Sequence, residues 1–113
     1  MTAYLIARVE VHDMDRYGEY MRHTPRVVAQ YGGRIITRGA TPLTLEGEAE
    51  TLRNVVIEFP GRDEAVAFFR SPEYARCSEL RQGASTGQFM VLDGFPEEDW
   101  GAALAASSEL SFD

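Results

Sequence analysis

The segment YLIARVEV, residues 4–11, decides the fold because its two faces differ so clearly. Side chains alternate between the faces of an extended strand, and the odd positions here are wholly apolar: Leu5, Ala7, Val9 and Val11. The even positions are mixed: Tyr4, Ile6, Arg8 and Glu10. Such a strand predicts a sheet that helices cover on the apolar side and leave open on the other.

The next segment predicts a helix that starts after Asp13 and stops at Gly32-Gly33. Asp13 suits the N-cap because its carboxylate can accept from the free amide groups of the first turn. Apolar and aromatic residues then recur at helical spacing up to Tyr31. Pro25 lies inside this helix and removes the hydrogen bond to the carbonyl of Met21, so we expect a kink or a split.

The remaining chain predicts three more strands, over residues 34–38, 54–59 and 88–93. Gly39 is expected to form a bulge or bend, and Leu43 and Leu45 to continue the first of these strands beyond Pro42. Residues 47–53 are interpreted as a polar loop that leads to the next strand.

Two helical segments, residues 62–69 and 72–84, precede the last strand. Ser71 suits the N-cap of the second helix and Pro72 its first position, where a missing amide has no effect. The order βαββαβ, with right-handed crossovers, predicts an α+β ferredoxin-like domain over residues 1–94. Its four-stranded antiparallel sheet carries both helical layers on one face.

Residues 95–113 form an acidic tail with an alanine-rich centre. One interpretation is a short helix over residues 97–106, with Trp100 and Phe112 docking on a neighbouring subunit. The alternative is a frayed tail.

The composition excludes several classes of function. The net charge is −7 and the cations form no run, which argues against nucleic acids and anionic membrane surfaces as partners. No signal peptide or membrane-spanning segment is evident, and Cys77 is the single cysteine, so a cytoplasmic location is expected. Neither a metal site nor a cofactor is expected, because the two histidines and one cysteine are scattered and no phosphate-binding glycine loop is present.

The open face of the sheet predicts a homodimer. Its apolar members would make a patch larger than monomers usually expose: Ile6, Ile36, Val56, Met90 and Leu92. A two-fold pairing of sheets would bury this patch.

Several segments resemble the DUF1330 family, whose members belong to the dimeric α/β-barrel superfamily. They are AYLIARVEVHD from Ala3, GGRIITRG from Gly32, LEG at Leu45–Gly47, VIEFPG at Val56–Gly61 and SPEYARCSELRQGA at Ser71–Ala84. The resemblance implies a ferredoxin-like subunit, a dimer with facing sheets and a cleft between sheet and helices. Relatives by fold include small monooxygenases, muconolactone-type isomerases and dye- or haem-handling proteins, and fold alone does not fix function.

Arg38 and Glu58 are the first candidates for chemistry. Both are expected on the open face, where Arg38 would hold an anionic or carbonyl oxygen and Glu58 would act as a general base or orienting group. The alternative is a salt bridge that fixes the register of the strands. Arg8 and Glu10 are a weaker pair of the same kind.

Five further residues complete the candidate site. His23 is a proton-shuttle candidate near Pro25, although a lone histidine on a helix flank is usually solvated. Tyr4, Tyr17 and Tyr74 would shape the walls of the cleft. Arg81 would bind an anion, or its stem would cover apolar surface.

These observations favour a dimer that binds a small organic molecule in the cleft, including the case of a metal-free enzyme. The alternatives are a non-catalytic dimer that binds another protein, and a structural dimer without a ligand. Cys77 has no base or second thiol beside it and is expected to be buried and inert.

Overall fold

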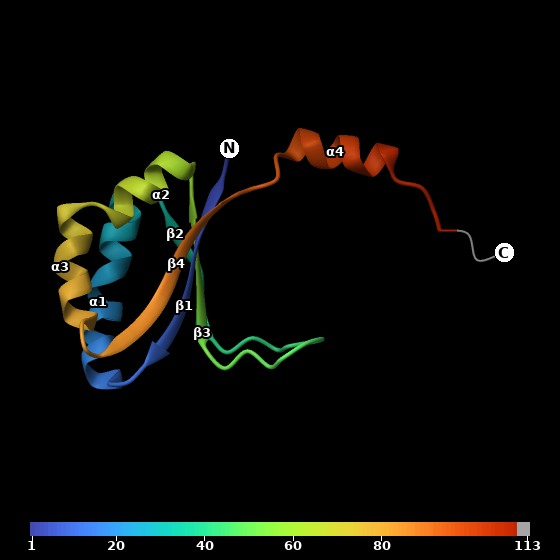
Figure 1. The fold of residues 1–113 in the computed structure, drawn as a ribbon. Coiled ribbons are helices and arrows are strands. Elements are labelled where there is room, and N and C mark those ends of the chain that lie inside the picture. Colours follow the sequence, from blue (N-terminus) through green and yellow to red (C-terminus); the bar gives the residue numbers. More distant parts are fainter. Residues whose placement is uncertain (111–113) are drawn as a thin grey trace.

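The computed structural model describes residues 1–110. The elements follow in the order β1 (Ala3–Val11), α1 (Met14–Gln30), β2 (Arg34–Ala40), β3 (Arg53–Phe59), α2 (Arg62–Phe69), α3 (Pro72–Arg81), β4 (Ser85–Asp93) and α4 (Glu97–Ala106). Figure 1 shows α1, α2 and α3 on one side of the sheet and α4 on the other.

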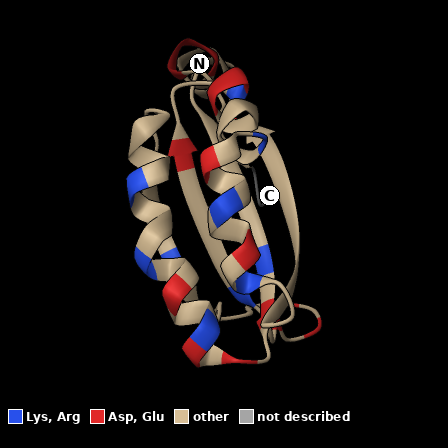
Figure 2. Ribbon diagram, turned by 90° about the vertical axis from the view of Figure 1, so that its left-hand side faces the viewer, with Lys and Arg blue, Asp and Glu red and all other residues tan. Residues whose placement is uncertain are grey.

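The four strands form one antiparallel sheet in the order β2-β3-β1-β4. Helices α1 and α3 pack side by side in front of it, with charges of both signs on their outward surface (Figure 2). This topology confirms the predicted α+β ferredoxin-like fold.

The hydrophobic core lies between the sheet and the three helices. The odd positions of β1 are buried as predicted, apart from Val11 at its end: Ala3, Leu5, Ala7 and Val9. Phe59 from β3 and Phe68 from α2 are among the most completely buried large side chains, with ring centroids 5.3 Å apart. The mixed face of β1 points away from this core.

The helix ends follow from the local sequence. Asp13 Oδ1 accepts a hydrogen bond of 3.2 Å from the amide of Arg16, and Ser71 Oγ accepts one of 3.0 Å from the amide of Tyr74. Gly32 has a φ of +79°, which lets the chain turn back so that the Gly33 amide bonds the Val28 carbonyl at 2.9 Å.

Two helix predictions need correction. Helix α1 runs through Pro25 as one element, so the expected split is wrong. Helix α3 ends at Arg81 instead of residue 84, because the chain turns at Gly83, whose φ is +77°. Strand β4 consequently begins at Ser85, three residues earlier than predicted.

Strand β2 differs from its prediction in register. It pairs Ile35 with Ile57 but Thr37 with Val56, so Ile36 is an extra residue in a bulge. A second shift at Gly39, with a φ of +85°, confirms the bulge predicted there. The first bulge reverses the alternation of faces, which places Arg38 opposite Val55 on the side of the helices.

The connection between β2 and β3 contains no strand. Leu43 and Leu45, expected to continue β2, are 85% and 90% exposed. This connection and α4 both project from the side of the sheet opposite the helices (Figure 1). Helix α4 covers the range predicted for a short helix and buries none of its residues. Phe112 lies outside the described residues.

None of the helices in residues 1–110 is both long and apolar enough to cross a membrane.

Candidate functional site

A pocket lies between the helix-facing side of the sheet and helix α1, with α2 and α3 closing one end. Its empty space is about 510 Å³, counting the solvent at its mouth. The sheet contributes Leu5, Ala7, Ile35, Arg38, Arg53, Val55, Ile57 and Phe89, and the helices contribute Tyr17, Tyr20, Met21, Thr24, Phe68 and Tyr74. Ala7 is the smallest of these side chains and lies on the central strand β1, where it leaves space under α1.

Three tyrosines form one wall. The rings of Tyr17 and Tyr20 are 5.2 Å apart, and the hydroxyls of Tyr20 and Tyr74 share a buried hydrogen bond of 2.8 Å. Burial raises the pKa of Tyr17 and of Tyr20 above the ordinary value of 10. Both phenols therefore stay protonated at neutral pH, and in the Tyr20–Tyr74 hydrogen bond either hydroxyl can be the donor.

Arg53 brings a cation into the pocket from the first position of β3. Its guanidinium lies 5.8 Å from the centroid of the Tyr17 ring, and its Nη2 is 3.9 Å from the sulfur of Met21. A side chain at Gly39 would bring its Cβ within 2.5 Å of Arg53 Nη2, so the glycine makes room for this guanidinium. Arg53 Nε is buried and has no hydrogen-bond partner among residues 1–110.

Arg38 lies at the mouth and is exposed. Its Nη2 donates a hydrogen bond to the carbonyl of Met21. In an unbroken helix this carbonyl would accept from the amide of residue 25, and Pro25 has none. The proline of α1 thus provides the acceptor that holds Arg38.

Arg81 lies beside the pocket, on the aromatic cluster behind it. Its guanidinium is 4.7 Å from the centroid of Phe89 and 5.6 Å from that of Tyr20, and its Nε is 3.4 Å from the hydroxyl of Tyr74. The charged end of Arg81 therefore packs on aromatic rings instead of lying in solvent above a covering stem.

The predicted pairing of Arg38 with Glu58 is wrong. The bulge at Ile36 turns Arg38 to the helix side, whereas Glu58 lies opposite Tyr4 on the open face and is 3.9 Å from Arg34. Of the predicted residues, the pocket brings together Tyr17, Tyr74 and Arg38.

His23 lies elsewhere. It lines a shallow groove on the outward surface of α1 and α3, with Cys77 at the bottom, and its Nε2 is 3.8 Å from Glu19. Burial raises the pKa of the Cys77 thiol, which matches the expectation of a buried, unreactive cysteine.

Arg53, Tyr20 and Thr24 are site residues that the sequence pattern did not predict. Extending the predicted strand 54–59 by one residue would have placed Arg53 on the same face as Val55 and Ile57. Thr24 donates to the carbonyl of Tyr20 at 2.6 Å. Because this bond lies within one helix, nothing in the sequence around Thr24 indicates a pocket.

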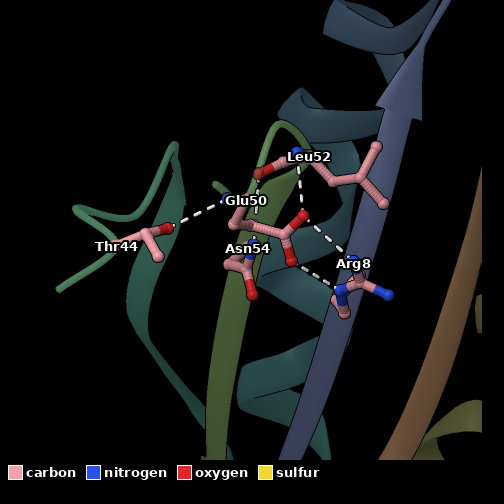
Figure 3. A network of polar contacts seen from close by, with 5 residues as sticks. All are labelled: Arg8, Thr44, Glu50, Leu52 and Asn54. Carbon is pink, nitrogen blue, oxygen red and sulfur yellow. Dashed lines mark hydrogen bonds and ion pairs between the residues drawn. The ribbon is translucent and has the colours of Figure 1, made fainter. Parts of the chain in front are cut away.

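Arg8 on the open face has a partner that the sequence did not predict. Its Nε and Nη2 donate to the two carboxylate oxygens of Glu50 at 2.6 and 2.9 Å (Figure 3). The amide of Leu52 also donates to Glu50, and the amide of Glu50 donates to Thr44. The hydrogen bonds from Arg8 and from the Leu52 amide lower the pKa of Glu50 from its ordinary 4.5 to about 2.

The side chains of the described residues also indicate which groups the protein could bind. Within residues 1–110, no three histidine, cysteine, aspartate or glutamate side chains lie close enough together to hold a metal ion. The pocket offers phenol and guanidinium groups instead, which bind oxygen atoms of a ligand.

A family model matches residues 2–95, and it describes a domain of unknown function, DUF1330. The chain belongs to the DUF1330 family. The match spans β1 to β4 and does not include α4. No curated protein matches this DUF1330 chain in sequence.

Solved structures share the fold of this DUF1330 protein. A protein of unknown function from Rhodopseudomonas palustris has a TM-score of 0.68 and 20% identity, over 84% of this chain and 83% of its own. A dimeric ferredoxin-like protein of unknown function from Jannaschia sp. CCS1 has a TM-score of 0.63 and 13% identity, over 83% and 100%. SnoaB, a cofactor-independent oxygenase from Streptomyces nogalater, has a TM-score of 0.61 and 11% identity, over 84% and 94%. At these identities the likeness shows the fold alone.

Proposed function

We propose that this protein is a homodimer that binds a small, planar organic molecule in the pocket between the sheet and the helices. The observation that carries the proposal is the lining of the pocket, where apolar and aromatic walls meet a few phenol and guanidinium groups. Ligand sites typically combine an apolar lining with a small number of convergent polar groups.

The dimensions favour a ligand with one ring. The enclosed inner part of the pocket has room for only a few water molecules. A ligand therefore enters as side chains at the mouth move, and Arg38 is the exposed one among them.

The chemistry of the lining favours binding and orientation over proton abstraction. Tyr17 and Tyr20 are protonated, and no carboxylate or imidazole lines the pocket among the described residues. SnoaB, an oxygenase without a cofactor, has the same fold. We extend the proposal to a metal-free reaction of the bound molecule, in which the pocket orients the substrate and donates hydrogen bonds to it.

A second copy of the chain is proposed to cover the open face of the sheet. Met90 and Leu92 are 42% and 59% exposed there, beside half-buried Ile6 and Val56. Helix α4 and the β2–β3 connection project on either side of this face and leave it accessible between them (Figure 1). The Jannaschia protein of the same fold is dimeric. Trp100 and Leu104, exposed on α4, would then pack on the partner subunit.

The pocket is tested by titrating isotope-labelled protein with benzamide and with benzoate while amide NMR shifts are recorded. We expect shifts that cluster on pocket residues for at least one compound. Ala7→Val adds two methyl groups to the floor of the pocket and should abolish these NMR shift changes. Ala75→Val makes the same change at an exposed position of α3 and should leave them intact. If the amide NMR shifts of the pocket residues do not change with either compound in the folded protein, the proposal is contradicted.

A second candidate is a dimer that binds another protein, which the exposed aromatic residues Phe95 and Trp100 around α4 favour. Removal of residues after Gly94 would abolish such binding, whereas the pocket shifts would persist.

A further inference from the structure

The pocket differs in charge from the rest of the molecule. The chain carries a net charge of −7, yet the charged residues that line the pocket are both arginines, Arg38 and Arg53. Within residues 1–110, neither of them has a carboxylate within 4.0 Å. A cleft lined by one sign of charge between apolar walls concentrates ligands of the opposite sign.

Arg53 supplies a donor that the fold leaves unused. Its Nε is buried and has no hydrogen-bond partner among the described residues, although a buried polar group without a partner is destabilising. The guanidinium is nevertheless held in place, by the Tyr17 ring, the Met21 sulfur and the space that Gly39 leaves. The Nε lies against Gly39, and the residue lines the pocket without a carboxylate partner among the described residues, so its guanidinium can donate to an oxygen atom of a ligand.

Arg38 supplies a second cation, which also contacts Met21. Its Nη2 bonds the carbonyl that Pro25 leaves free, and the other guanidinium N–H groups take no part in that bond. Met21 thus contacts both arginines, Arg38 through its carbonyl oxygen and Arg53 through its sulfur. Tyr17, whose ring lies under the Arg53 guanidinium, adds a neutral hydroxyl to the lining of the pocket.

We infer that the molecule bound in the pocket is an organic anion, whose carboxylate, enolate or phenolate oxygen accepts hydrogen bonds from Arg53 and Arg38. The inference rests on the proposed function and names the class of its ligand. Its ring lies against the tyrosines and the apolar floor, and its oxyanion lies at the mouth beside the two guanidinium groups. Carboxylates and similar oxyanions match the fork of N–H donors that arginine presents.

The test compares benzoate with benzamide, which have the same ring and differ in charge. We expect the wild-type protein to bind benzoate at least about tenfold more tightly than benzamide, because hydrogen bonds to charged groups are the stronger ones. Arg53→Met and Arg38→Met keep much of the stem and remove the charge, and each should lower the ratio of the two affinities. Arg16→Met removes an exposed charge away from the pocket and should leave the ratio unchanged.

The outcomes separate this inference from the proposed function. If neither compound reaches the pocket, the proposed function fails. If both bind there with equal affinity, or if the ratio is the same in Arg53→Met and Arg38→Met as in the wild type, only the anion inference is overturned. Because Arg38 is exposed, Arg38→Met is expected to fold even where Arg53→Met does not, and the wild-type ratio is decisive in either case.

Discussion

The two faces of the sheet both carry arginines, but within residues 1–110 only one face supplies their counter-ions. On the open face, Arg8 has Glu50 at 2.6 Å and Arg34 has Glu58 at 3.9 Å. On the face toward the helices, Arg38 has a backbone carbonyl and Arg53 has a sulfur and an aromatic ring.

This difference separates arginines that pair with a carboxylate of the chain from arginines that have no such partner among the described residues. A guanidinium whose donors are met by a carboxylate is neutralised within the chain. One that meets only a carbonyl or a ring keeps its charge for another molecule. The open face, with its balanced charge, is thus the surface proposed for assembly, and the helix-facing pocket is the proposed place for a ligand.

The largest expected effect comes from a charge in the centre of the open face. Ile6→Lys places an unpaired ammonium where a second copy is proposed to pack, and leaving a charge buried without a partner costs about 3–5 kcal/mol. We expect the dissociation constant of the dimer to rise by at least about a hundredfold, measured by light scattering across concentration.

Ala75→Lys provides the control, because Ala75 is exposed on α3 and should not affect assembly. Benzoate should still bind to the dissociated Ile6→Lys protein, since the pocket is built from one copy of the chain. A wild-type protein that is monomeric at micromolar concentration would remove the assembly role of this face.

A smaller effect tests how the pocket holds Arg38. Pro25→Ala restores an amide for the Met21 carbonyl, so the bond from Arg38 should then matter less. In a double-mutant cycle, Arg38→Met should destabilise the wild type more than the Pro25→Ala protein, by about 0.5–1 kcal/mol in urea unfolding. Strictly additive changes would show that Arg38 does not depend on the carbonyl that the proline frees.

The fold was predictable because short-range patterns determine it. The alternation in residues 4–11, the Asp13 and Ser71 caps and the Gly32-Gly33 stop are local signals, and each corresponds to an observed element or boundary. Their order left few ways to arrange one sheet and one layer of helices.

The site was less predictable because it depends on single residues of register. One extra residue at Ile36 moved Arg38 from the open face to the pocket, and no local signal marks Ile36 as a bulge. Arg53 lies one position before the predicted strand and was assigned to a loop. Glu50 meets Arg8 across 42 residues of sequence, a contact that only the folded chain creates.

The smallest effect, at neutral pH, concerns the Arg8–Glu50 pair itself. The pKa of Glu50 is about 2 in the folded protein and 4.5 ordinarily, so its contribution to stability is fully present above about pH 4.5. That contribution is lost as the pH falls from 4.5 toward 2, because the unfolded chain takes up the proton first. Asp93 contributes in the same sense, because its hydrogen bonds from Arg62 lower its pKa. The informative quantity is therefore the difference in melting temperature between the wild type and Glu50→Gln. It should be small but positive at pH 7, since exposed ion pairs contribute little, and should shrink steadily below pH 4.5.

Glu48→Gln, in the same connection but outside the network of Figure 3, should show no such trend. A difference that stays constant from pH 7 to pH 3 would mean that Glu50 does not bind Arg8 as a carboxylate, and the contrast between the two faces would then rest on Arg34 and Glu58 alone.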